Sequence, residues 1–70
     1  MLRTPVSSTS LRAIGYDALS STLEIEFKTG SVYEYAGVSA IEHQNLMSAA
    51  SHGSYFARNI RDSYSYRRVA

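Results

Sequence analysis

The stretch TLEIEFKTGSVYEY, residues 22–35, carries the clearest structural signal in the 70-residue chain. Leu23, Ile25 and Phe27 alternate with charged residues, which is the pattern of a strand with one buried face and one face open to water. The Lys-Thr-Gly sequence that follows is typical of a three-residue hairpin loop in which Gly30 takes the left-handed conformation. The stretch therefore predicts an antiparallel hairpin.

The length of the hairpin loop decides where two tyrosines point. A three-residue loop pairs Ile25 with Tyr33 and Leu23 with Tyr35, so that both rings join the apolar face with their hydroxyls at its rim. A two-residue turn would shift the register by one residue and would turn both rings to solvent as stacking platforms. We prefer the first register.

Periodicity on either side of the hairpin predicts the other elements. SLRAIGYD favours a strand at 11–16, which joins strands at 22–28 and 31–36. Ser39 and Glu42 have the spacing of a capping box and begin a helix at 39–50. Its apolar stripe would be Val38, Ile41, Leu46 and Ala49.

A second helix is expected after the SHGS break. Ser54 can cap a helix at 54–62, which gathers its apolar residues on one side and places Arg58 and Arg61 on the opposite side. The tail YSYRRV alternates again and fits either a short edge strand or an ordered extension.

These elements predict an α+β fold: a three-stranded antiparallel meander with two C-terminal helices packed on one sheet face. We assign residues 1–10 to a flexible N-terminal tail and 11–70 to a single domain. The expected buried residues are Leu23, Ile25, Phe27, Ile41, Leu46, Phe56 and Ile60.

Composition limits the class of protein. The chain contains no cysteine, so disulfides and thiolate metal sites are excluded, and a reducing, cytoplasmic location is expected. No apolar run approaches the roughly 20 residues of a membrane span. We expect a monomer with no cofactor, no metal and no membrane contact.

The charge is unevenly distributed along the chain. Residues 52–70 carry a net charge of +3 and residues 1–51 a net charge of −2. Such polarity suits an anionic partner, although a solvated basic terminus has the same composition.

The residues of acid–base chemistry do not form a recognisable catalytic set. His43 and His52 lack zinc-type spacing with a third ligand, and no serine lies in a Gly-x-Ser-x-Gly elbow. A domain this small rarely encloses a catalytic pocket, so we expect no enzyme activity.

The chain contains IGYD at 14–17, a Tyr-x-Tyr at 33–35 and GSYFARNIR at 53–61. These motifs resemble those of the KTSC domain, a short bacterial domain found alone or at the C-terminus of some lysyl-tRNA synthetases, and the resemblance spans about residues 11–69. The resemblance implies a stand-alone, three-stranded α+β domain. It also implies a link to RNA, which the fusion to a synthetase has suggested for the family.

Two binding functions remain open from the residues. Arginines and tyrosines near the C-terminus suit single-stranded or tRNA-like RNA, since tyrosines stack on unpaired bases and arginines contact phosphates. The same basic, aromatic end could instead dock on an acidic protein surface or pair its edge strand with another chain. The candidate nucleic-acid contacts are Ser54, Arg58, Arg61, Tyr64, Tyr66, Arg67 and Arg68.

Overall fold

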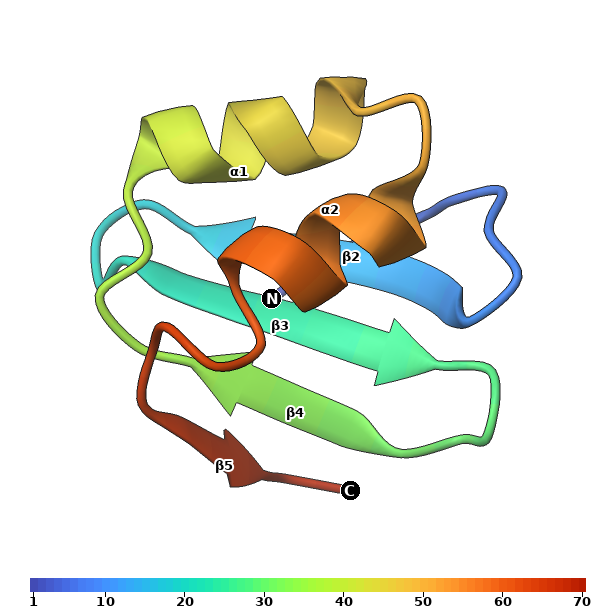
Figure 1. The fold of residues 1–70 in the computed structure, drawn as a ribbon. Coiled ribbons are helices and arrows are strands. Elements are labelled where there is room, and N and C mark those ends of the chain that lie inside the picture. Colours follow the sequence, from blue (N-terminus) through green and yellow to red (C-terminus); the bar gives the residue numbers. More distant parts are fainter.

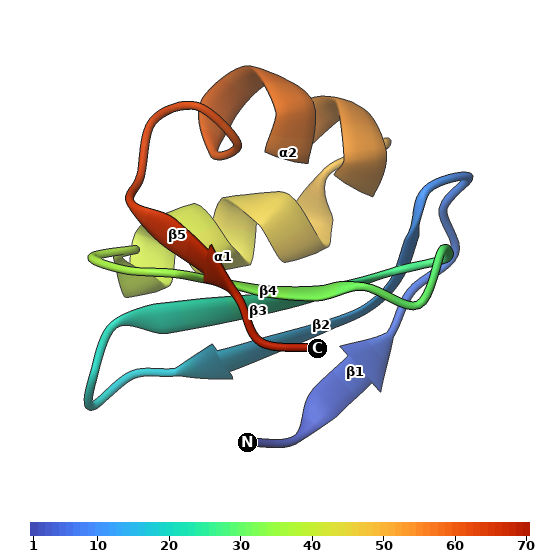
Figure 2. The ribbon, with the colours of Figure 1, turned by 90° about the horizontal axis from the view of Figure 1, so that it is seen from below.

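In the computed structural model of residues 1–70, five antiparallel strands form one sheet in the order β1-β2-β3-β4-β5. Figure 1 shows β2 to β5 side by side, and Figure 2 also shows β1. Two helices lie between β4 and β5 in sequence, and both cover the same face of the sheet (Figure 2). The α+β class and the placement of both helices on one face are confirmed, but the prediction of three strands is wrong. The elements are β1 (Arg3–Pro5), β2 (Leu11–Asp17), β3 (Thr22–Phe27), β4 (Val32–Tyr35), α1 (Ala40–Ser48), α2 (His52–Asn59) and β5 (Tyr66–Arg68).

The two additional strands are the outer ones. β1 pairs with β2, and β5 pairs with β4, each over three residues that are all exposed. Such short, exposed strands bury no alternating apolar face, so periodicity cannot reveal them. β1 arises from the segment that we assigned to a tail. The division into a tail at 1–10 and a domain at 11–70 stays a prediction.

The β3–β4 hairpin has the predicted three-residue loop. The Phe27 N–H donates to the Ser31 carbonyl at 2.9 Å, and Gly30 has a φ of 98°. Leu23 therefore lies opposite Tyr35, and Ile25 lies opposite Tyr33. The register confirms that both tyrosines share the helix-covered face with the apolar residues of β3.

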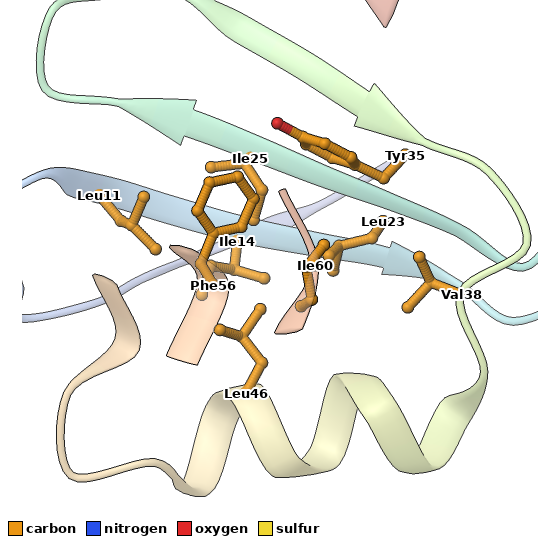
Figure 3. Packing of buried hydrophobic residues seen from close by; sticks show 9 residues of the cluster. All are labelled: Leu11, Ile14, Leu23, Ile25, Tyr35, Val38, Leu46, Phe56 and Ile60. Carbon is orange, nitrogen blue, oxygen red and sulfur yellow. The ribbon is translucent and has the colours of Figure 1, made fainter. Parts of the chain in front are cut away.

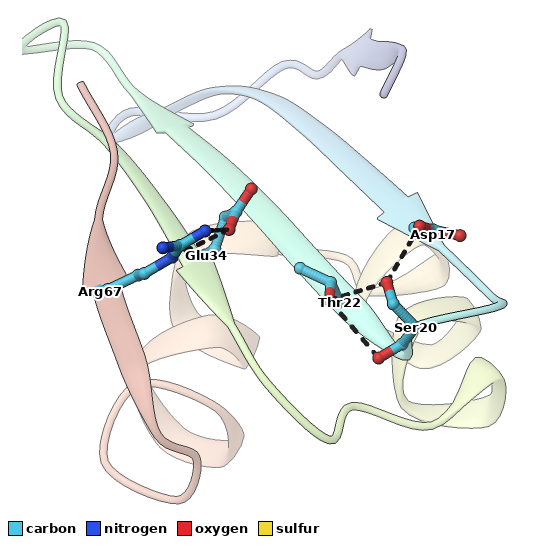
Figure 4. Close-up of polar contacts among 5 residues, drawn as sticks. All are labelled: Asp17, Ser20, Thr22, Glu34 and Arg67. Carbon is cyan, nitrogen blue, oxygen red and sulfur yellow. Dashed lines mark hydrogen bonds and ion pairs between the residues drawn. The ribbon is translucent and has the colours of Figure 1, made fainter.

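A network of short polar side chains closes the β2–β3 turn (Figure 4). Asp17 accepts bonds from the Leu19 N–H at 3.1 Å and from the Ser20 hydroxyl at 2.9 Å. The Ser20 hydroxyl is also 2.9 Å from that of Thr22. These bonds hold a reversal in which Ser21 has a φ of 54°, a left-handed value uncommon outside glycine.

The helix caps agree with the sequence only in part. Ser39 caps α1 by accepting from the Glu42 N–H at 3.1 Å, but the Glu42 carboxylate bonds to tyrosines instead of completing the capping box. Ser51, not Ser54, caps α2, and its hydroxyl accepts from the Ser54 N–H at 3.2 Å. The helix therefore begins at His52, inside the stretch that we expected to break it.

Nine buried side chains form the core, from three strands, both helices, the loop before α1 and the residue after α2 (Figure 3). Of the expected core residues, Phe27 is only half-buried, and Ile41 is 68% exposed. The prediction for Ile41 is wrong because α1 turns Glu42 and His43 inward beside Leu46, and both polar side chains find partners there. The core residues are Leu11, Ile14, Leu23, Ile25, Tyr35, Val38, Leu46, Phe56 and Ile60.

Neither helix has the length and the apolar character needed to cross a membrane.

Candidate functional site

A groove of about 510 Å³ opens between α2 and the half of the sheet that ends in β5. Its floor is aromatic, because the hairpin register and the β4–β5 pairing place rings from three adjacent strands on the same face. We call this feature the tyrosine groove. It is lined by Ser10, Phe27, Thr29, Ser31, Tyr33, Tyr35, Gly53, Phe56, Ala57, Arg61, Asp62 and Tyr66.

Gly53 allows the loop before β2 to close one end of the tyrosine groove. A Cβ added at this glycine would lie 2.9 Å from the Ser10 hydroxyl and 3.4 Å from that of Ser8. A larger residue would displace the exposed Ser10 side chain, so glycine lets this side chain pack directly against α2.

Three tyrosines of the groove pack on one another. The ring centroid of Tyr66 lies 5.7 Å from those of both Tyr33 and Tyr35, in tilted arrangements. Tyr35 is only 3% exposed, whereas Tyr66 is 61% exposed. Tyr66 is thus a solvent-facing ring supported from below by two others, a geometry suited to stacking against a planar ligand.

The hydroxyls of Tyr33, Tyr35 and Tyr66 share another property, since none of them has a hydrogen-bond partner within the protein and none is fully buried. We call these residues the free tyrosines. Burial raises the pKa of Tyr35 to about 12, and the neighbouring Tyr33 and Tyr66 add to the rise. Its hydroxyl therefore stays protonated and able to donate at neutral pH.

The other three tyrosines are bonded to acceptors of the protein, and we call them the locked tyrosines. The Tyr16 hydroxyl donates to the Val38 carbonyl at 2.7 Å. Tyr55 and Tyr64 both donate to the carboxylate of Glu42, Tyr64 at 3.1 Å. Glu42 thereby ties α1 to α2 and to the loop that leads into β5.

The bonds to Glu42 also change how the two tyrosines ionise. The hydrogen bond to Glu42 raises the pKa of Tyr55, while burial, followed by the bond to Glu42, raises the pKa of Tyr64. Both phenols thus remain neutral donors, which favours the bonded arrangement. Tyr64 is half-buried and does not line the tyrosine groove, so it lies apart from the groove that Tyr66 lines.

One ion pair stands at the edge of the groove. Arg61, immediately after α2, lies with its Nε 3.7 Å from Oδ2 of Asp62, and the two side chains are 58% and 83% exposed. Both residues line the groove. The pair is solvated, so either partner is free to exchange it for a bond to a ligand.

The remaining predicted contacts are dispersed. Arg67 lies on the opposite sheet face, where its NH2 group is 3.2 Å from Oε1 of Glu34 (Figure 4). Arg68 donates from Nε to the Ala70 carbonyl at 2.8 Å. Ser54 and Arg58 are exposed on α2 but do not line the groove. Of the predicted set, Arg61 and Tyr66 line the tyrosine groove, and Arg67 shares a second hollow with Tyr66.

The groove contains residues that sequence reasoning did not select. Asp62, Thr29 and Ser31 line it, as do Tyr33 and Tyr35, for which we preferred a core-facing ring with its hydroxyl at the rim over a stacking platform. The Lys-Thr-Gly loop contained enough information to place Tyr33 beside Phe27. Nothing in the sequence pairs Tyr35 with Tyr66, because that contact depends on the return of the chain as β5.

The two histidines take part in packing and capping. The His43 ring stacks on Tyr16 at a centroid distance of 4.6 Å, and burial lowers its pKa. Nδ1 of His52 is 2.8 Å from the Leu46 carbonyl at the end of α1. No three side chains of the kinds that bind metal ions are gathered in one place.

Comparison with known proteins identifies the family. The KTSC domain model matches residues 7–64. An uncharacterised protein of Stutzerimonas stutzeri is 37% identical over 70 residues and covers 99% of both chains. A crystal structure of a KTSC domain protein from Yersinia pestis is 40% identical, with a TM-score of 0.96 over 99% of this chain and 97% of that one.

Longer proteins contain a related segment. The lysine–tRNA ligase of Nostoc sp. is 33% identical over 60 residues, which are 86% of this chain and 11% of the ligase. That of Trichormus variabilis is 36% identical over 55 residues, again about a tenth of the ligase. The chain thus spans a small part of these enzymes. With a family model that covers most of its length and a relative of equal length, the chain belongs to the KTSC domain family.

Proposed function

We propose that this KTSC domain is a non-catalytic module that binds single-stranded RNA in the tyrosine groove. The observation that carries the proposal is the exposed Tyr66 ring, backed by two tyrosines and standing over the same groove as Arg61. A base stacks on Tyr66, and the guanidinium of Arg61 contacts the phosphate that follows. The C-terminal charge of +3 supports the same polarity.

The groove suits unpaired rather than duplex RNA. Stacking on Tyr66 requires a base whose face is free, and the bases of a duplex are stacked on each other. A tRNA offers such bases in its loops and at its 3′ end. The lysine–tRNA ligases that contain a related segment support RNA as the ligand class, since tRNA is a substrate of these ligases by their name.

Two arginines provide a matched pair for testing the proposal. Arg61 and Arg67 are both exposed, and each is paired with one carboxylate, but only Arg61 lines the groove. We expect Arg61→Ala to weaken binding of a fluorescent single-stranded RNA. The slope of the logarithm of the binding constant against the logarithm of the salt concentration should become shallower by about 0.7 units, the value for one phosphate contact on a single strand. Arg67→Ala should bind as the parent does.

Tyr66 provides the second variant. Tyr66→Ala should weaken binding by about 1–3 kcal/mol, roughly 5- to 150-fold, with only a small change in melting temperature, because the ring is mostly exposed. Fluorescence anisotropy between 50 and 200 mM salt gives both the affinity and the slope. Equal losses for Arg61→Ala and Arg67→Ala, or an affinity that is independent of salt, would contradict the proposal.

A second candidate function is favoured by the free edge of β5. The Ala36 N–H bonds to the Ser65 carbonyl, and the Val69 N–H bonds to the Val32 carbonyl, so the alternate residues Tyr66 and Arg68 turn their backbone groups outward. An extended segment of a partner protein can add to this edge. This candidate takes the place of RNA binding if the purified domain binds no RNA at low salt.

A further inference from the structure

The carboxylate of Asp62 is the feature of the tyrosine groove that phosphate binding does not explain. It stands beside Arg61 at 3.7 Å and is itself 83% exposed. A carboxylate repels phosphate, so a groove that held only the RNA backbone would gain nothing from a negative charge at this place. A ligand group that donates hydrogen bonds, in contrast, would be stabilised by this carboxylate.

Asp62 and Arg61 place hydrogen-bond acceptors and hydrogen-bond donors next to each other. Asp62 supplies two acceptor oxygens, while Arg61 comes closest to Asp62 through Nε, at a distance too long for a hydrogen bond, so its guanidinium N–H groups can donate to a ligand. A ligand edge that matches this pair has one acceptor and, next to it, two donors. The edge must also belong to a planar group that stacks on Tyr66, which stands over the same groove.

Guanine has this edge, and the other RNA bases do not. Its N1–H and N2–H are adjacent donors that a single carboxylate accepts together, and its O6 accepts from a guanidinium. Adenine and cytosine each offer one amino group beside a ring acceptor, which a carboxylate repels. Uracil offers one N–H between two carbonyls, with the same conflict.

We infer that the tyrosine groove selects guanine, with the base stacked on Tyr66, Asp62 accepting from N1–H and N2–H, and Arg61 donating to O6. The inference rests on the proposed binding of single-stranded RNA and adds a base preference to it. The hydroxyls of the free tyrosines are available for hydrogen bonds to the ribose, since they lack partners within the protein. Arg61 then donates to the base in the complex with guanine, and it contacts a phosphate in complexes with the other bases.

The preference is measured with a set of heptanucleotides that differ only in the central base. Each has three uridines on either side of guanine, inosine, adenine, cytosine or uracil. We expect guanine to bind at least tenfold more tightly than adenine or uracil. Inosine should lose several-fold relative to guanine, because it keeps O6 and N1–H and lacks only the N2 amino group.

Asp62→Asn tests the residue, and Glu34→Gln is its control. The asparagine can accept through one oxygen only, so guanine and adenine should bind the variant within about twofold of each other. Glu34 is likewise a carboxylate paired with an arginine, but it lies on the opposite sheet face. Glu34→Gln should therefore keep the full preference of the parent.

The outcomes separate the inference from the function on which it rests. Salt-dependent binding of all five RNAs with equal affinity would overturn the guanine preference and leave RNA binding intact. A preference that survives Asp62→Asn would overturn the role of Asp62. An absence of binding to every RNA at low salt would overturn both proposals together.

Discussion

The locked tyrosines and the free tyrosines differ in one respect, namely what their hydroxyls contact. Tyr55 and Tyr64 bond to the carboxylate of Glu42, and Tyr16 bonds to a backbone carbonyl. Tyr33, Tyr35 and Tyr66 have no such partner and stand together at one groove.

The difference separates two uses of the same residue type. A locked hydroxyl donates its hydrogen bond within the protein. The bonds from Tyr55 and Tyr64 to Glu42 therefore link α1 to α2 and to the loop that leads into β5. A free hydroxyl at a groove is available to a ligand. Tyr35 belongs to both uses, because its ring lies in the core while its hydroxyl faces the groove.

The largest effect is expected where a free tyrosine is also a core residue. Tyr35→Ala removes a ring that is 3% exposed and leaves a cavity against Phe56, so it should cost on the order of 3–5 kcal/mol in the free energy of unfolding. Urea denaturation followed by circular dichroism measures it. The control is Tyr66→Ala, which should cost well under 1 kcal/mol. Similar costs for the two variants would contradict the assignment of only Tyr35 to the core.

An intermediate effect should separate locked from free hydroxyls. Tyr64→Phe removes a donor to the half-buried Glu42 carboxylate and should cost about 1–2 kcal/mol in the free energy of unfolding. Tyr66→Phe removes a hydroxyl without a protein partner and should stay within about 0.5 kcal/mol of the parent. The comparison between the two sets of tyrosines fails if both phenylalanine variants have the same stability.

The smallest effect appears only at alkaline pH. The pKa of Tyr35 is raised by burial from 10.0 to about 12, so the unfolded chain loses this proton first, and the stability that it represents falls as pH rises from about 10 to 12. At pH 11 this loss amounts to about 1 kcal/mol relative to pH 9. Tyr35→Phe should show a smaller fall over the same range, by urea denaturation at both pH values. Parallel falls in the parent and the variant would show that Tyr35 titrates normally.

The fold could be predicted where the sequence is periodic. The alternation of Leu23, Ile25 and Phe27 and the glycine of the loop favoured the β3–β4 register that the structure has over a shift of one residue, which would have turned Tyr33 and Tyr35 to solvent. The outer strands could not be found. Each is three exposed residues long, and its existence depends on the neighbour that it pairs with.

The candidate site could be predicted only in its composition. Arginine and tyrosine near the C-terminus indicated a basic, aromatic surface, and Arg61 and Tyr66 do meet at the groove. Side chains alternate between the two sheet faces along β5, so Arg67 pairs with Glu34 on the face opposite the groove. The hydroxyl of Tyr64 bonds to Glu42, which is distant in the sequence. Both outcomes rest on pairings between residues more than 20 positions apart, which a local pattern does not contain.

The central claim is that RNA binds at the tyrosine groove, and an NMR titration of the labelled domain tests it most directly. Single-stranded RNA added at low salt should shift the amide signals of the groove, chiefly those of Tyr33, Arg61 and Tyr66. The amide signals of Arg3 and Thr4, in β1 at the other edge of the sheet, should shift far less. Shifts centred on β1, or no shifts with RNA in excess, would contradict the account.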